Sequence, residues 1–126
     1  MHKYLVIFIF GLFSLASSAE ELGYSGRKTE GKSVEEILSD LKSNKSYEVY
    51  VQGGWTIASS KEGVMYSFTP TDHPAYPSFV ERRVIERDGS IFIDMSARCG
   101  ASKEVCDDLV RSFQELNKKI IKSMGG

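Results

Sequence analysis

A histidine in a proline-rich segment is one of the few side chains in this sequence suited to acid–base chemistry. His73 lies in Pro70–Pro77, which contains all three prolines of the chain. A general base needs a nucleophile and an orienting carboxylate within hydrogen-bond reach, and Ser78 and Asp72 are close in sequence. However, the prolines indicate a rigid loop, and no nucleophile-elbow pattern is present. We therefore expect an exposed loop histidine, and a hydrolase using His73 is the least favoured of three functional hypotheses.

The two cysteines of the chain, Cys99 and Cys106, are seven residues apart. This spacing is wider than the Cys-x-x-Cys motif of redox-active pairs, so a structural disulfide is the preferred interpretation. Two cysteines and His73 cannot supply the four ligands of a typical structural zinc site. The sequence predicts one disulfide and no metal or cofactor site.

An Asp-Gly pair predicts the register of a β-hairpin. Asp88-Gly89 separates strands expected over 78–86 and 91–98, and this dipeptide favours a two-residue turn. Arg87 then pairs with Ser90, and alternate residues of each strand share a face of the sheet. The core-facing side is expected to contain Val80, Arg82, Val84, Ile93, Met95 and Ala97, with Arg82 near its edge.

The opposite face of this hairpin carries the densest group of charges that the pattern predicts. Its expected members are Phe79, Glu81, Arg83, Ile85, Phe92, Asp94 and Arg98. Arginines among aromatic residues are typical of protein-binding surfaces, and two arginines could also bind a carboxylate or phosphate. The alternative is a solvated face whose cross-strand ion pairs each contribute little. Tyr76, between two prolines and near His73, predicts a second contact point on a rigid loop.

Trp55 indicates a different kind of site. It follows Gly53-Gly54, which interrupts a strand pattern at 47–58 and predicts a bulge or sharp bend. A pocket near Trp55, between the helices and the curved sheet, would bind a small molecule. Aromatic residues at strand spacing are otherwise typical of sheet packing.

Periodicity predicts how the remaining segments fold. A capping box at Ser33–Glu36 and an apolar stripe predict a short helix over 33–44. A turn at 60–63 leads to a strand at 64–69. A long helix over 102–124 has acidic residues early and lysines late, as the helix dipole favours. The expected fold is α+β: a short N-terminal helix, a four-stranded antiparallel meander and a long C-terminal helix, with both helices on one face of the sheet.

The first residues have the pattern of a cleavable secretory signal. Lys3 is followed by the uncharged segment Tyr4–Phe13 and by Ser17-Ser18-Ala19, so cleavage is expected near Ala19–Glu20. The apolar run is shorter than the roughly 20 residues of a spanning helix, and a permanent signal anchor is the alternative. The expected organisation is a signal peptide at 1–19, a flexible mature N-terminus at 20–32 and one α+β domain at 33–126.

Charge limits the class of partner. The chain has 16 Lys and Arg against 17 Asp and Glu, a net charge of −1. This balance argues against nucleic acid, which requires a clustered basic face. The preferred hypothesis is a bacterial periplasmic or secreted protein-binding module without enzymatic activity, such as an inhibitor, immunity or envelope accessory factor. Its partner would be another protein of the envelope or exterior, with no membrane span after cleavage. A small-ligand binder with a pocket near Trp55 is the alternative.

Overall fold

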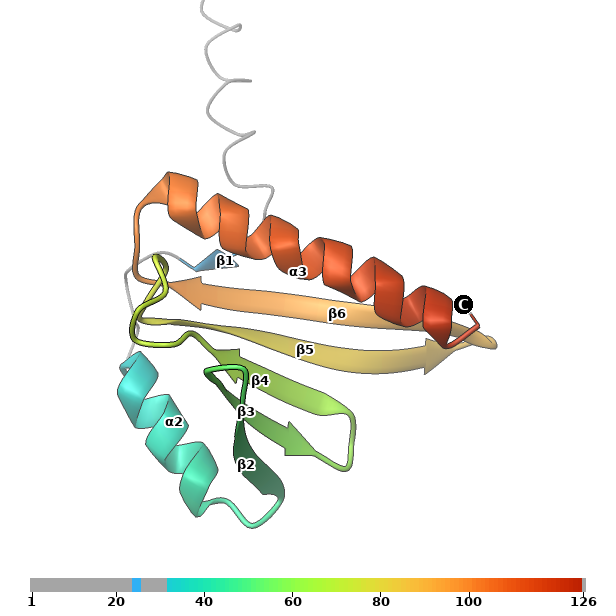
Figure 1. Ribbon diagram of the computed structural model, residues 1–126. Helices are drawn as coiled ribbons and strands as arrows, with labels where there is room; N and C mark the ends of the chain where they lie inside the picture. The colour runs from blue at the N-terminus through green and yellow to red at the C-terminus, as the bar shows by residue number, and fades with distance from the viewer. Residues whose placement is uncertain (1–23, 26–31, 126) are drawn as a thin grey trace, which may run out of the picture.

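The structure is a computed structural model that describes residues 24–25 and 32–125 (Figure 1). The predicted signal peptide at 1–19 lies outside the described residues, and so does most of the predicted N-terminal segment at 20–32. The described residues form an α+β fold. Its elements are β1 (Tyr24–Ser25), α2 (Val34–Ser43), β2 (Tyr47–Gln52), β3 (Trp55–Ser60), β4 (Val64–Phe68), β5 (Ser78–Arg87), β6 (Ser90–Cys99) and α3 (Lys103–Ser123).

All the described strands belong to one sheet, in the order β1-β6-β5-β4-β3-β2. From β2 to β6, each strand pairs antiparallel with the next one in the sequence. At the outer edge of β6, the short β1 pairs in parallel, with Tyr24 opposite Ala97. The antiparallel part therefore has five strands, and the expectation of four was wrong.

The additional strand arises at Gly53 and Gly54. Both glycines have positive φ angles, 59° and 87°, and Gln52 pairs directly with Trp55 across them. Positive φ at both central residues is the requirement of a type I′ hairpin turn. The segment therefore reverses direction and forms two strands, whereas a bulge or bend would have kept it as one.

The register of the β5–β6 hairpin is confirmed. Arg87 pairs with Ser90, and the pairing continues without interruption to Ser78 opposite Cys99. Asp88 and Gly89 form the turn with φ angles of 55° and 80°. The same alternation of faces that the dipeptide predicted is present along both strands.

The predicted N-terminal ends of both helices are also confirmed. The Ser33 hydroxyl accepts a hydrogen bond from the Glu36 amide at 3.1 Å, and the Glu36 carboxylate accepts one from the Ser33 amide at 2.8 Å. At the start of α3, the Ser102 hydroxyl accepts from the Val105 amide at 3.4 Å. These bonds satisfy amides that a helix N-terminus otherwise leaves unpaired.

A disulfide joins the end of the sheet to the last helix. Cys99, the final residue of β6, is bonded to Cys106 in the first turns of α3, as the spacing predicted. Both cysteines are buried. Closing so short a loop is worth about 2–3 kcal/mol in the chain-entropy description of disulfides. The bond fixes the reversal after which α3 runs back along β6 (Figure 1).

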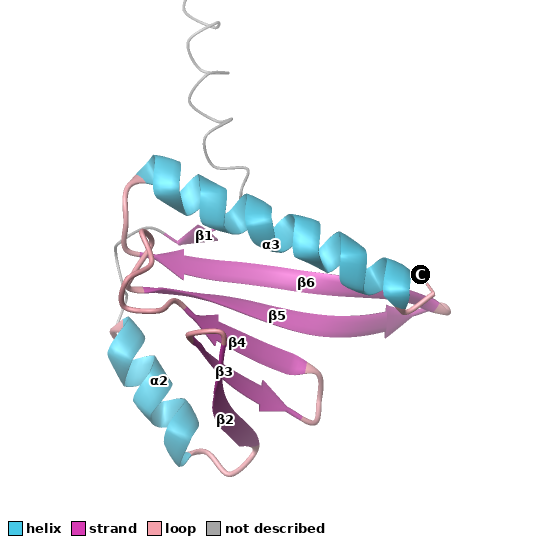
Figure 2. Ribbon diagram, in the orientation of Figure 1, coloured by secondary structure: helices cyan, strands magenta, loops and turns pink. Residues whose placement is uncertain are grey.

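The two helices cover opposite faces of the sheet, so the expectation that they share a face was wrong (Figure 2). One hydrophobic cluster joins α3 to β5 and β6 through Val110 and Val80. The other joins α2 to β3, β4 and β5 through Leu41, Phe68 and Phe79. Because α2 leads into one edge of the sheet and α3 follows the strand near the other, each apolar stripe is buried separately.

Neither helix in the described part of the chain has the length and apolar character that crossing a membrane requires.

Candidate functional site

The charged face predicted on β5 and β6 is divided into a covered and an open part. At the covered end, Phe79 is only 7 % exposed because it packs with Leu41 of α2 and with Phe68. The Arg98 guanidinium lies 5.7 Å from the Phe79 ring centre and donates a 2.7 Å hydrogen bond to the Lys32 carbonyl. Phe79 therefore belongs to the core and is not available to a partner.

The open end carries the remaining predicted residues. Arg83 forms an ion pair with Glu81 at 3.3 Å, and Arg83 lies opposite Asp94 in the sheet register. Farther along, Phe92 is 48 % exposed, with the Arg87 guanidinium 5.8 Å from its ring centre. These residues form a mixed charged and aromatic surface on the part of this face that α2 does not cover.

The proline loop lies at the opposite end of β5 from Phe92. Tyr76 is 40 % exposed and lies two residues before the start of β5, whereas Phe92 pairs with Ile85 near the far end of the strand. At about 3.3 Å per residue, the seven positions from Ser78 to Ile85 span roughly 23 Å. The structure therefore does not bring Tyr76 and Phe92 into one contact surface. Tyr76 instead lines a cavity of about 490 Å³ between the loop and α2.

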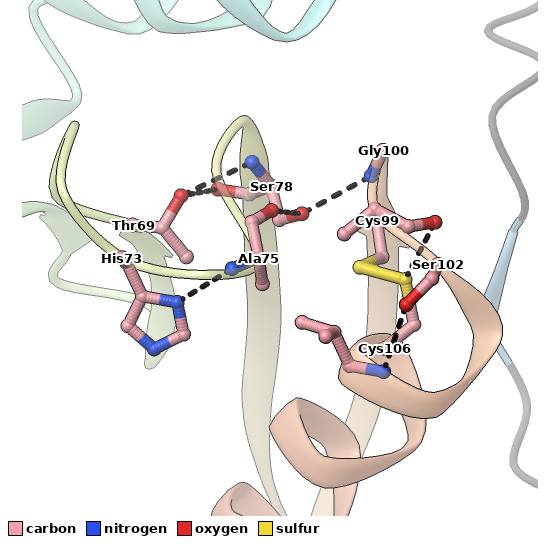
Figure 3. Close-up of a disulfide and its surroundings, with 10 residues drawn as sticks. Thr69, His73, Ala75, Ser78, Cys99, Gly100, Ser102 and Cys106 are labelled. Carbon is pink, nitrogen blue, oxygen red and sulfur yellow. Dashed lines mark hydrogen bonds between the residues drawn. A yellow bond between two sulfur atoms is a disulfide. The ribbon is translucent and has the colours of Figure 1, made fainter.

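His73 points inward, toward the sheet. Its ring makes an edge-on contact with Trp55 at 5.2 Å between centroids, and its Nδ1 accepts a 2.9 Å hydrogen bond from the Ala75 amide (Figure 3). The role of this histidine in the structure is to close the loop and to support Trp55.

Ser78 does not provide the nucleophile that a hydrolase using His73 would need. Its side chain is buried, and its hydroxyl donates to the Ala75 carbonyl and accepts from the Gly100 amide at 3.1 Å (Figure 3). Thr69 completes this network, because its hydroxyl accepts from the Ser78 amide at 3.1 Å. These bonds hold the loop against the end of β6, next to the disulfide.

A large cavity lies beside Trp55, between α3 and strands β2 to β4. It has a volume of about 630 Å³, within the size range of small-molecule sites. Its apolar walls are Tyr50, Trp55, Ile57, Phe113, Leu116 and Ile120. Gln52, Ser67 and Ser112 add polar groups, and among the described residues Arg82 is the one charged residue in the lining.

Arg82 is buried in an environment poor in hydrogen-bond acceptors. The residue is 9 % exposed, and its guanidinium carbon lies 5.1 Å from the centre of the Phe113 ring. Nη1 donates to Asn117 Oδ1 at 3.5 Å, and Nη2 donates to the Met65 sulfur at 3.2 Å. Nε is buried without a hydrogen-bond partner among the described residues.

The electrostatics of Arg82 follow from these contacts. In the described ranges, 24–25 and 32–125, none of the ion pairs involves Arg82. Burial lowers the pKa of its guanidinium from the ordinary value, because the charged form loses hydration. Arginine nevertheless stays protonated in proteins, so a positive charge is present beside an apolar cavity.

A second, smaller cavity lies on the other side of Arg82. It has a volume of about 250 Å³ and is lined mainly by apolar side chains, including Val84 and Ile93. Arg82, Met65 and Ile120 line both cavities, so these three side chains form the partition between them.

Sequence reasoning anticipated one part of this site and missed another. A cavity is present near Trp55, where the small-ligand hypothesis expected one, but it lies beneath α3 alone. Arg82 was expected near the edge of the core-facing side of the hairpin, without a functional role. The available signal was an arginine between Val80 and Val84, on the face that the hairpin register assigned to the core.

The described residues contain no group of three His, Cys, Asp or Glu side chains arranged to hold a metal ion. In comparisons with known proteins, no family model, curated protein or solved structure matched the chain.

Proposed function

We propose that this chain is an exported protein that binds a small molecule in the cavity between α3 and strands β2 to β4. The observation that carries the proposal is the cavity itself: about 630 Å³, walled by aromatic and aliphatic side chains, with Arg82 as the one charged residue that the described part of the chain adds to its lining. Binding sites for small molecules typically combine such apolar walls with a few polar groups that orient the ligand.

Export is supported by the pattern of residues 1–19 and by the buried disulfide, because disulfides persist mainly in oxidising compartments. Intact mass spectrometry of protein recovered from a bacterial envelope fraction tests this part. We expect a chain that begins at Glu20 and is two hydrogen atoms lighter than the reduced form. A chain retaining its first 19 residues, or free thiols in the native protein, would contradict it.

Binding can be tested with Nile red, a neutral apolar dye whose emission rises in apolar surroundings. We expect saturable binding to the wild-type protein and weaker binding to Ser112→Phe, because Ser112 lines the cavity from α3. Ser123→Phe is the matched control. Each serine donates a 2.8 Å hydrogen bond to the carbonyl three residues earlier, but Ser123 does not line the cavity.

If the dye does not saturate, the cavity is not a binding site. If both variants bind it as the wild type does, the dye binds elsewhere and the assignment to this cavity is wrong.

A protein-binding surface is the second candidate function, and the exposure of Phe92 at the open end of the β5–β6 face favours it. It would use Arg83, Phe92 and Asp94, without Phe79. Capture of a specific protein from envelope extract, lost with Phe92→Ala and Arg83→Ala and retained with Ser112→Phe, would support it. Capture that is unchanged by Phe92→Ala and Arg83→Ala would exclude this surface.

A further inference from the structure

We propose that the ligand of this cavity is an apolar organic anion, whose carboxylate or phosphate group pairs with Arg82 while its apolar body lies against Trp55 and Phe113. This inference rests on the proposed function, since it assigns a chemical class to the ligand of the same cavity.

Among the described residues, the charge of Arg82 forms no ion pair. A buried charge normally has a counter-charge or a full set of hydrogen bonds, because removing it from water is costly. Arg82 is more than nine-tenths buried, yet within the part of the chain that the structure describes its Nε has no partner. A ligand anion would supply the missing counter-charge in surroundings of low polarity, where charge-assisted hydrogen bonds are strong.

The terminal nitrogens of Arg82 make only weak hydrogen bonds. The bond from Nη1 to Asn117 is 3.5 Å long, at the outer limit for a hydrogen bond, and Nη2 donates to a thioether sulfur. Thioether sulfur is only a weak acceptor. A carboxylate or phosphate can accept two parallel bonds from a guanidinium, so it would exchange poor contacts for strong ones.

The walls of the cavity favour a ligand with an apolar body. The cavity walls nearest Arg82 are aromatic and aliphatic: Phe113 lies beside the guanidinium, and Trp55 contacts Phe113 with 5.6 Å between ring centroids. Leu116, an α3 residue of the lining, is 40 % exposed, so apolar surface at the cavity is still accessible. Inorganic phosphate or a small sugar acid would leave these walls wet, whereas an acyl or aryl group would bury them.

The fluorescence of Trp55 provides a direct test, because it is the only tryptophan in the chain and lines the cavity. The probes are dodecanoate, dodecyl phosphate and 1-dodecanol, each below its micellar or solubility limit. They share one apolar chain and differ in the head group. We expect at least one of the two anions to bind about 10- to 100-fold more tightly than the alcohol, the effect of a charge-assisted hydrogen bond.

The comparison of head groups also distinguishes the source of the anion. Tighter binding of dodecanoate would assign a carboxylate, and tighter binding of dodecyl phosphate would assign a phosphate monoester. If the alcohol binds as tightly as both anions, the anionic class is wrong while the proposed small-molecule function stands. If none of the three changes Trp55 fluorescence and Nile red also fails to bind, both proposals are wrong.

Two arginine variants test whether the charge of Arg82 causes the preference for an anionic head group. Arg82→Met should remove the preference for the anion, whereas Arg83→Met, the adjacent arginine on the opposite face of β5, should retain it. A preference that persists in a folded Arg82→Met protein would overturn the assignment to Arg82. If Arg82→Met does not fold, the anion-to-alcohol ratio of the wild-type protein still decides whether the ligand class is correct.

Discussion

Phe79 and Val80 are adjacent in the sequence but belong to different hydrophobic cores, Phe79 with Leu41 of α2 and Val80 with Val110 of α3. Each face of the sheet is therefore covered over one part only. On the α3 face, a space remains between α3 and strands β2 to β4, and this space is the cavity that Arg82 lines. On the α2 face, the far ends of β5 and β6 remain open and present Phe92. The cavity beside Trp55 and the exposed surface at Phe92 both arise because α2 and α3 cover different parts of opposite faces of the sheet.

The difference between Phe79 and Phe92 can be measured directly, since both lie on the same face of the β5–β6 hairpin. Phe79→Ala should lower the free energy of unfolding by about 3–5 kcal/mol, because it leaves a cavity beneath α2. Phe92→Ala should change it by less than about 1 kcal/mol, because the ring is half exposed. Urea unfolding monitored by circular dichroism provides both values. Equal losses would contradict the division of this face into covered and open parts.

Features that depend on a few adjacent residues could be predicted from the sequence. Asp88-Gly89 determined the register of β5 and β6, because few dipeptides accommodate positive φ at two successive positions. Ser33 and Ser102 determined where the helices begin, because their hydroxyls bond to amides within the next turn. In each case the interaction that decides the structure lies within about four residues.

The face that each helix covers and the number of strands could not be predicted in this way. Gly53-Gly54 is compatible with a bulge and with a hairpin, and the outcome depends on whether the flanking strands pair with each other. An apolar stripe predicts that a helix is buried but not against which side of a sheet. The lack of a counter-charge at Arg82 could not be predicted either, because it depends on a tertiary contact. The α3 residue that contacts the guanidinium is Asn117 and not an acidic residue.

The hairpin at Gly53 and Gly54 gives a second measurable contrast. Gly53→Asn should leave the free energy of unfolding unchanged or raise it by about 0.5 kcal/mol, because φ is 59°, the space around it is open and asparagine tolerates this conformation. Gly54→Ala should lower it by about 1–2 kcal/mol, because φ is 87° and a side chain is strained there. Thermal unfolding of the two variants gives both values. Equal destabilisation by both substitutions would argue against a type I′ turn.

The environment of Tyr66 predicts that the protein loses stability at alkaline pH. Burial and the nearby Glu81 carboxylate raise the pKa of its phenol to about 12, whereas the unfolded value is about 10. Below pH 10 both states keep the proton, so the contribution of this group is fully present. Between about pH 10 and 12 the unfolded state loses the proton first, and stability falls as pH rises.

Tyr66→Phe tests this prediction because it removes the titrating group and keeps the ring. The free energy of unfolding of the variant should fall less steeply than that of the wild type between about pH 10 and 12. Ultraviolet titration of the native wild-type protein should also show a component, absent from Tyr66→Phe, that ionises near pH 12. If that component is missing, the environment assigned to Tyr66 is wrong.

Arg82 gives the prediction that separates a binding residue from a structural one. Replacing a residue that stabilises the fold lowers the stability of the protein. A charge that is buried to bind a ligand instead lowers the stability of the unliganded protein, so replacing it raises that stability. Arg82→Met keeps the long side chain over Phe113 and removes the uncompensated charge. We expect the unliganded variant to gain about 1–3 kcal/mol in free energy of unfolding, the range observed when buried ionic groups are replaced by apolar ones.

The matched control is Arg83→Met, whose arginine is exposed and paired with Glu81 on the opposite face. Its effect should stay within about 0.5 kcal/mol, since exposed ion pairs contribute little. Both variants can be compared with the wild type by urea unfolding, where a change in midpoint at constant slope reports a change in stability. If Arg82→Met is destabilised, the contacts with Asn117, Met65 and Phe113 satisfy the charge within the fold. The guanidinium would then contribute to the fold, and the anion-to-alcohol ratio of the wild-type protein would decide whether it also binds a ligand anion.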